Sequence, residues 1–184
     1  MKTVGEFVQE AIDFADRGLS ELALIPACAA FELTAQKASS DINYRKIVDE
    51  NWWLISFLGF PHSTLLYLEL PIVIKEISPN PRNHTLKDIV TFVLTHTLRN
   101  GKLPENVNLR PVGKFERRGS RLLIPHNLVF GLLGYAIFNP VNKGETISDK
   151  YWLDVSSFKM FVSEFFGRID LAERIIKLHR ESNS

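Results

Sequence analysis

The segment from Asn127 to Phe138, NLVFGLLGYAIF, has almost no polar side chains and limits how the rest of the chain can fold. It is far shorter than the roughly 20 residues that cross a lipid bilayer, so we expect a helix buried in a protein core. A helix that is apolar all round must be covered all round. Gly131 and Gly134 are spaced to let another element approach closely. The sequence therefore predicts further helices packed around this one.

Apolar residues also recur at helical spacing in other parts of the chain, and most of these runs have recognisable end signals. A first helix is expected after Thr3, a candidate N-cap, and it should stop at Gly18. A second reaches Ala38, and Pro26 must either kink it or lie in its first turn. The remaining helical runs are expected at residues 42–59 after the candidate cap Asp41, at 86–100 before Gly101, and, as one or two helices, at 162–179.

Alternating apolar residues predict strands in other places. The run from Leu66 to Ile74 alternates, and Pro71 in its middle favours a sheet edge or an interruption. A loop is expected at residues 78–85. Two short strands, VNLRPV and RLLIP, are expected around the polar turn ERRGS, and another is expected in KYWLDV.

These elements predict an α+β fold that is mainly α, a helical bundle with a small β-hairpin or sheet insertion around residues 106–125. The chain of 184 residues is long enough for one sizeable core, and no segment reads as a linker between domains. We therefore expect a single domain over residues 1–184.

Charge and cysteine content exclude several classes of protein. A net charge of +1 gives no overall attraction to nucleic acid or to an anionic membrane. Cys28 alone excludes an internal disulfide and a multi-cysteine metal site, and the 5 histidines lack the short spacing of a zinc site. Acidic residues near the N-terminus argue against an export signal. We expect a cytoplasmic protein with no membrane contact, no metal and no other cofactor.

The end of the predicted helix at 86–100 carries the first candidate site. His96 and Arg99 are three residues apart, so they can be neighbours on one helix face, and Asn100 follows. An arginine fork beside a histidine can hold a phosphate or carboxylate and exchange a proton near neutral pH. The alternative is structural, since the last turn of a helix favours cationic side chains near its unpaired carbonyl groups. Both interpretations remain open from the sequence.

Arg99 and Asn100 resemble the start of the signature of the HEPN superfamily, in which an arginine and a polar residue near a helix end precede a histidine by four to six residues. HEPN domains are helical bundles, often dimeric, and many are metal-independent ribonucleases or nucleotide binders. The resemblance implies an RNA or nucleotide ligand at Arg99 and Asn100, and a homodimer. This sequence has Pro104–Asn106 where the histidine belongs. Cleavage would therefore need His96, which lies on the other side of Arg99, as the proton carrier.

A basic segment forms the second candidate site. Five basic residues lie within twelve positions, with one acid, Glu116, among them: Arg110, Lys114, Arg117, Arg118 and Arg121. Together with Phe115, such a hairpin can contact nucleic-acid phosphates and stack on a base. The alternative is a solvated turn whose arginines pair with acids elsewhere on the surface.

Three hypotheses about function follow. The first is a non-catalytic module that binds RNA or a nucleotide through Arg99, Asn100 and the basic segment. The second is a structural or protein-interaction domain, in which Trp52-Trp53 or the EFFGR segment at 164–168 offers aromatic contacts, although at least one member of each aromatic pair should pack in the core. The third is a metal-independent ribonuclease with His96 and Arg99 as catalytic candidates.

Overall fold

The computed structural model describes residues 2–60, 70–72, 82–111, 116–118, 121–155 and 158–182. For residues 70–72, 82, 83, 117, 155, 158 and 182 it describes the backbone alone. Within these ranges the helices are α1 (Val4–Asp16), α2 (Ser20–Ala38), α3 (Tyr44–Glu50), α4 (Trp52–Gly59), α5 (Leu86–Asn100), α6 (Leu128–Phe138) and α7 (Ile169–Ser182). Two short 3-10 helices are η1 (Pro140–Asn142) and η2 (Val162–Glu164).

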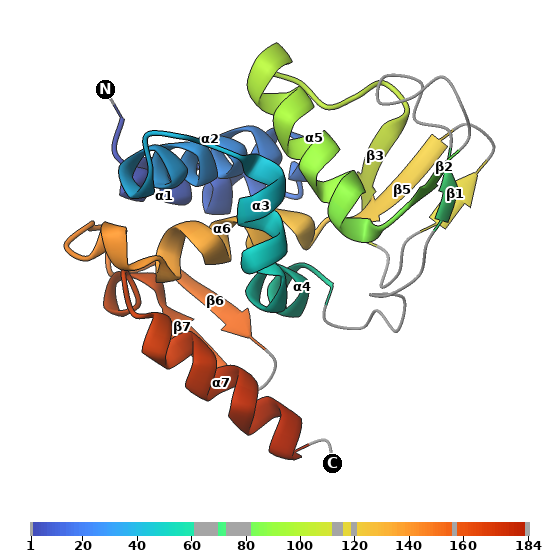
Figure 1. Ribbon diagram of the computed structural model, residues 1–184. Helices are drawn as coiled ribbons and strands as arrows, with labels where there is room; N and C mark the ends of the chain where they lie inside the picture. The colour runs from blue at the N-terminus through green and yellow to red at the C-terminus, as the bar shows by residue number, and fades with distance from the viewer. Residues whose placement is uncertain are drawn as a thin grey trace.

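The strands form three small sheets within the described ranges. They are β1 (Leu70–Ile72), β2 (Arg82–His84), β3 (Val107–Arg110), β4 (Glu116–Arg118), β5 (Arg121–Pro125), β6 (Trp152–Val155) and β7 (Phe158–Phe161). β1 pairs with β2, β6 pairs with β7, and the third sheet has the order β3-β5-β4. The predicted mainly helical α+β fold with a small sheet insertion is therefore confirmed (Figure 1). That the chain forms a single domain stays a prediction.

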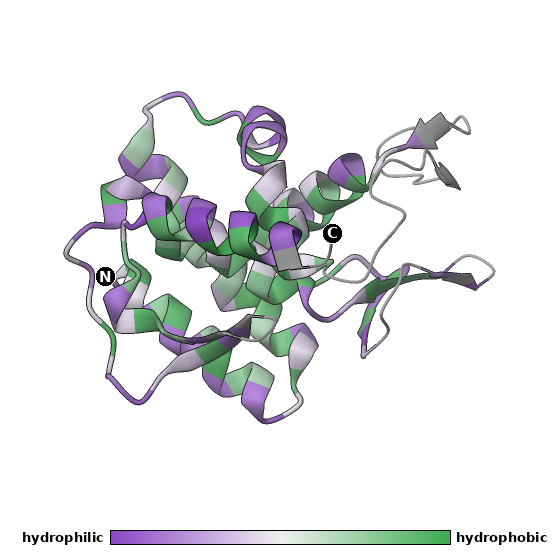
Figure 2. Ribbon diagram, turned by 90° about the horizontal axis from the view of Figure 1, so that it is seen from below, coloured by the Kyte–Doolittle hydropathy of each residue, from purple (hydrophilic) through white to green (hydrophobic). Residues whose placement is uncertain are grey.

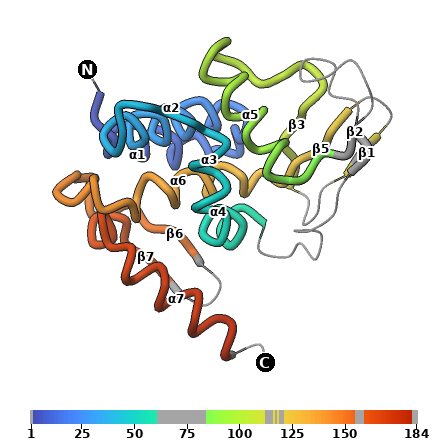
Figure 3. Tube along the Cα trace, in the orientation of Figure 1, coloured from blue at the N-terminus to red at the C-terminus, as the bar shows by residue number. Residues whose placement is uncertain are grey.

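Helix α6 lies at the centre of the helical part, as its composition predicts. Every α6 residue except Phe130 is buried, and the helix packs against α4, α2 and α1. Figure 2 shows hydrophobic residues mainly on the helix sides that face one another and hydrophilic residues mainly on the outer sides. Among the described helices, none has the length and hydropathy needed to cross a bilayer. Figure 3 shows the N-terminus beside α1 and the C-terminus at the far end of α7.

Two glycines let α6 and α4 approach at backbone distance. A Cβ atom added to Gly131 would lie 2.7 Å from the backbone oxygen of Ile55 and 3.1 Å from the Cα of Gly59. Seen from the other helix, a Cβ atom added to Gly59 would lie 3.4 Å from the Cα of Gly131, which is ordinary contact. The close packing predicted for Gly131 is thus a contact between backbones.

Local capping explains the helix ends that the sequence predicted. The Thr3 hydroxyl accepts a hydrogen bond from the Glu6 N–H at 3.1 Å, and the Glu6 carboxylate accepts one from the Thr3 N–H at 2.7 Å. Gly18 and Gly101, with φ of 72° and 64°, take the left-handed conformation that follows a helix end. Pro26 lies inside α2, well past its first turn.

Three local predictions were wrong. The helix expected over residues 42–59 begins instead after Asn43, whose side chain accepts from the Lys46 N–H at 3.0 Å, and Asp41 does not cap it. It breaks at Asn51 (φ −105°, ψ 14°), where the Ile47 carbonyl accepts from both the Asn51 N–H at 3.1 Å and the Asn51 side-chain amide at 2.9 Å. The loop expected at 78–85 contains strand β2, which pairs antiparallel with β1.

The sheet topology also differs from the expected one. VNLRPV and RLLIP do not form a hairpin, because β3 and β5 run parallel, and β4 comes from the segment expected to be a turn. β5 is buried from Leu122 to Pro125 and is the central strand, so it needs a neighbour on each side. Of the strand expected at 66–74, residues 70–72 form β1 and the others lie outside the described residues.

Replacing Gly131 with alanine should destabilise the protein. Overpacking costs about 1–3 kcal/mol, and the better helix propensity of alanine returns about 1 kcal/mol. We expect the free energy of unfolding, measured by urea titration, to fall by up to about 2 kcal/mol. Gly59→Ala is the matched control, since its Cβ atom meets the same crossing at ordinary distance, and it should lose nothing. Equal stabilities for the two variants would contradict this packing.

Candidate functional site

The end of helix α5 places the first three candidate residues in different environments. His96 is half-buried, its ring lies 5.8 Å from that of Phe92, and its Nε2 atom is buried without a hydrogen-bond partner. Arg99 is exposed, and Asn100 donates from its side chain to the His96 carbonyl at 2.9 Å. The Asn100 side chain is therefore bonded back onto the last turn of its own helix. This arrangement matches the structural alternative for Asn100.

The strand register places the arginines of the basic segment at different positions in the sheet. Arg118 lies directly opposite Arg121 across β4 and β5, whereas Arg117 takes the next register position, opposite Leu122. Arg110 lies opposite Pro125, at the other end of β5 from Arg121. Lys114 lies outside the described residues. The arginines that the structure brings together are thus Arg118 and Arg121.

Within the described residues, one acid pairs with this couple of arginines, and it pairs with Arg118. The Arg118 guanidinium donates to the Glu116 carboxylate at 3.0 Å and 3.2 Å, and 73% of its side chain is exposed. Arg121 is exposed, and within the described ranges no acid forms an ion pair with it. Like charges directly opposite in a sheet repel, so this end of the β4–β5 pair keeps an excess of positive charge. Among the described residues, no hydrogen bond or ion pair joins it to Arg99.

A polar network lies where α1, α2 and η1 meet. The Lys37 ammonium contacts the Glu145 carboxylate and donates to the Asn142 side chain at 3.1 Å. The Asn142 amide donates to the Thr34 hydroxyl at 2.8 Å and to the Ala136 carbonyl at 2.7 Å. Because each buried member has a partner, this network stabilises the fold and offers no free group for chemistry.

The second Glu145 oxygen fixes the start of α1. It accepts from the Gly5 N–H at 2.9 Å, and a Cβ atom on Gly5 would lie 2.1 Å from the backbone oxygen of Thr146. Burial alone would raise the pKa of Glu145, but the hydrogen bonds from Lys37 and Gly5 outweigh it and hold that pKa below its usual range. Glu145 is therefore charged at neutral pH.

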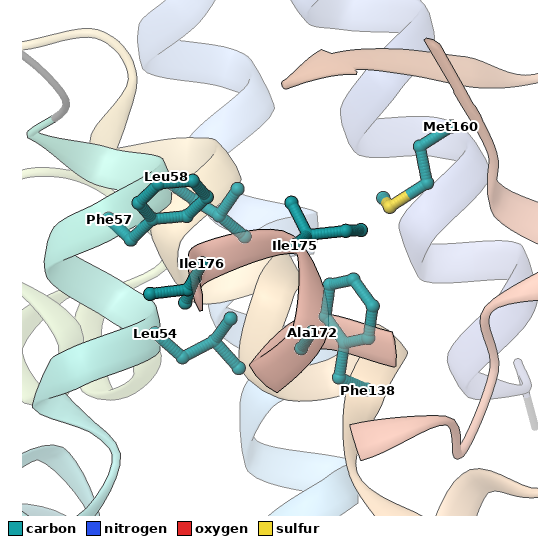
Figure 4. Close-up of a pocket in the computed structure, with 8 residues that line it drawn as sticks. All are labelled: Leu54, Phe57, Leu58, Phe138, Met160, Ala172, Ile175 and Ile176. Carbon is teal, nitrogen blue, oxygen red and sulfur yellow. The ribbon is translucent and has the colours of Figure 1, made fainter. Parts of the chain in front are cut away.

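An apolar pocket lies under the C-terminal helix (Figure 4). About 200 Å³ of space, part of it open to solvent, separates side chains of α4, α6, β7 and α7. The lining residues are Leu54, Phe57, Leu58, Phe138, Met160, Ala172, Ile175 and Ile176. They include no polar side chain to orient a ligand. Among the described residues, no group of His, Cys, Asp and Glu is placed to hold a metal.

The aromatic residues proposed as contacts mostly belong to the core. Trp52 is 9% exposed and Trp53 packs against the core cluster. Phe166 is 5% exposed, and the Phe165 ring meets that of Phe138 edge-on at 5.8 Å. The prediction that at least one member of each pair is a core residue is confirmed.

The sequence analysis missed an exposed aromatic pair. Trp152 on β6 lies directly opposite Phe161 on β7, and the two are 40% and 41% exposed. The Lys159 ammonium lies 3.6 Å from the centre of the Trp152 ring. The alternation in KYWLDV was recognised, but its partner strand FKMF was not, so the pairing of the two rings could not be foreseen.

Comparison with known proteins links the chain to sequences without a stated activity. A family model described as Rv1289 matches residues 3–184. Uncharacterized protein Rv1289 of Mycobacterium tuberculosis strain H37Rv is 23% identical over 193 residues, covering 98% of this chain and 90% of the relative. Uncharacterized protein Mb1320 of Mycobacterium bovis shows the same identity and coverage. No solved structure matches the chain.

Glu145→Gln should lower the free energy of unfolding at neutral pH but not in acid. Because the folded-state pKa of Glu145 is lowered, its contribution is present above the unfolded-state pKa of about 4.3 and is lost as pH falls through the folded-state value. We expect the variant to lose about 1–2 kcal/mol at pH 7, and the difference from the parent to shrink below pH 4. Chemical denaturation across pH measures both effects.

Glu10→Gln is the control for this pH dependence. Glu10 pairs with Lys2 on the surface at 2.8 Å, where ion pairs contribute little. A loss for Glu145→Gln that is constant across pH, or equal to that of Glu10→Gln, would show that the charge of Glu145 does not hold the network.

Proposed function

The chain belongs to the Rv1289 family, and we propose that it is a non-catalytic module that binds the phosphates of RNA through Arg118 and Arg121. One observation carries the proposal: Arg118 and Arg121 are both exposed and lie directly opposite each other at one end of the β4–β5 pair, and Glu116 pairs with Arg118 alone. A phosphate placed there would relieve their repulsion and accept hydrogen bonds from both guanidinium groups. The resemblance to HEPN domains stays a prediction that agrees with this ligand class.

A binding role fits the described geometry better than cleavage does. A proton carrier must reach the reacting oxygen directly or through one water, and burial of the His96 Nε2 atom leaves Nδ1 as the one ring nitrogen that could do so. Arg99 and Asn100 are both exposed, but the Asn100 side chain donates to the His96 carbonyl, so we assign the phosphate contact to Arg99. Arg99 can add a phosphate contact to a strand of RNA that extends from the sheet, as can Arg117 and Lys114. We propose further that the protein acts in the cytoplasm and as a homodimer.

RNA binding should depend on salt and on the facing arginines. Each phosphate contact on a single strand contributes a slope of about −0.7 to log affinity against log salt. With two such contacts, affinity should fall about sevenfold between about 50 and about 200 mM salt. Fluorescence anisotropy of a labelled single-stranded oligoribonucleotide measures this for the parent and for Arg118→Ala/Arg121→Ala, in which the affinity and the slope should both drop.

Arg174→Ala/Lys177→Ala removes the same charge from the exposed face of α7 and serves as the matched control. It should bind like the parent. No binding by the parent at low salt, or equal losses in the control and in the sheet variant, would overturn the proposed function. Cleaved oligonucleotide that disappears with His96→Ala would instead support the ribonuclease hypothesis.

A further inference from the structure

The β6–β7 hairpin carries a self-complementary outer face. Residues directly opposite in a sheet point to the same side, so Trp152 with Phe161 forms one row and Asp154 with Lys159 forms the next. These four side chains are exposed, while Leu153 and Met160 on the other side are buried. The outer face thus combines an aromatic row and a row with one acid and one base.

Among the described residues, no ion pair joins Asp154 to Lys159 across the hairpin. Lys159 lies opposite Asp154, yet its ammonium is placed over the Trp152 ring. Within the described ranges no ion pair involves Asp154. Because Asp154 and Lys159 do not pair with each other, each can form an ion pair with an oppositely charged residue on a second surface.

The hairpin is also held firmly before any partner arrives. The Tyr151 hydroxyl, just before β6, donates to the Asp13 carboxylate of α1 at 2.8 Å, and the Val162 N–H, just after β7, donates to the Tyr151 carbonyl at 3.0 Å. Burial and the Asp13 carboxylate raise the pKa of Tyr151 to about 12, so the hydroxyl keeps its proton. Little ordering is therefore required when this face is covered.

We propose that the outer face of the β6–β7 hairpin is the contact between two copies of this chain. A two-fold axis parallel to the strands, midway between two facing hairpins, sets β6 of one copy against β7 of the other. Trp152 then meets the partner's Phe161, and Asp154 meets the partner's Lys159, each contact occurring twice. A two-fold axis across the strands would instead set the aromatic row against the charged row. The charge pattern therefore selects the first arrangement.

This inference identifies the surface of the homodimer proposed above and does not depend on RNA binding. A two-stranded face is smaller than the roughly 800 Å² per partner of a standard interface. We therefore expect a dimer that dissociates on dilution.

The test is sedimentation velocity of the purified chain over a concentration series, without RNA. The parent should shift from monomer to dimer, and Trp152→Ala should raise the dissociation constant at least about tenfold, as expected for an aromatic anchor. Asp154→Lys and Lys159→Asp should each weaken self-association, because each places like charges opposite one another across the axis. An equimolar mixture of these two variants should dimerise again, because every facing pair is then of opposite charge.

The mixture distinguishes two reasons for weaker self-association: loss of a contact between copies, or damage to the hairpin itself. Mixing the variants can restore the contact but cannot repair a damaged fold. Leu22→Ala, which trims another exposed apolar side chain (47% exposed) on α2, should leave the dissociation constant unchanged. A parent that stays monomeric at every concentration overturns the inference and leaves a different protein as the occupant of this face. Failure of the mixture to dimerise, with the parent dimeric, also overturns it.

Discussion

Burial of α6 is the constraint on which the other elements depend. A helix without a polar side cannot reach the surface, so α1, α2 and α4 must each give it an apolar face. At Gly131 the contact becomes backbone against backbone, because only a hydrogen atom fits beside the Ile55 carbonyl. Helix α5, the sheets and α7 then attach outside this assembly. The network of Lys37, Glu145 and Asn142 fixes how α1 and α2 enter it.

Short-range sequence signals predict the helix ends, whereas the long-range pairing of strands could not be predicted from the sequence. Thr3, Gly18 and Gly101 act on residues within one turn of themselves, so their effect can be derived from the sequence. The break at Asn51 and the parallel pairing of β3 with β5 depend on which surfaces meet in space. No short sequence pattern carries that information, so these features could not be predicted.

The candidate sites divide in the same way. The sequence predicts a turn at Arg117 and Arg118, and only the register of β4 shows that Arg118 lies opposite Arg121. The charge of the segment could thus be predicted, and its pairing could not. His96 looked like an exposed helix-end residue, whereas the packing on Phe92 buries its Nε2 atom. The Trp152–Phe161 pair can be predicted only if both strands are recognised, and the sequence of β7 has no pattern that predicts a strand beside β6.

The two proposed surfaces lie on different flanks of the helical core. In Figure 1 the sheet with β3 and β5 extends from one side, and the β6–β7 hairpin lies on another, beside α7. A dimer formed through the hairpins would leave both arginine pairs uncovered and would carry two phosphate-binding surfaces on one particle. Because a second surface then binds the same RNA at high effective concentration, two weak sites give a much tighter complex. Dissociation of the dimer on dilution would remove that gain while leaving each site intact.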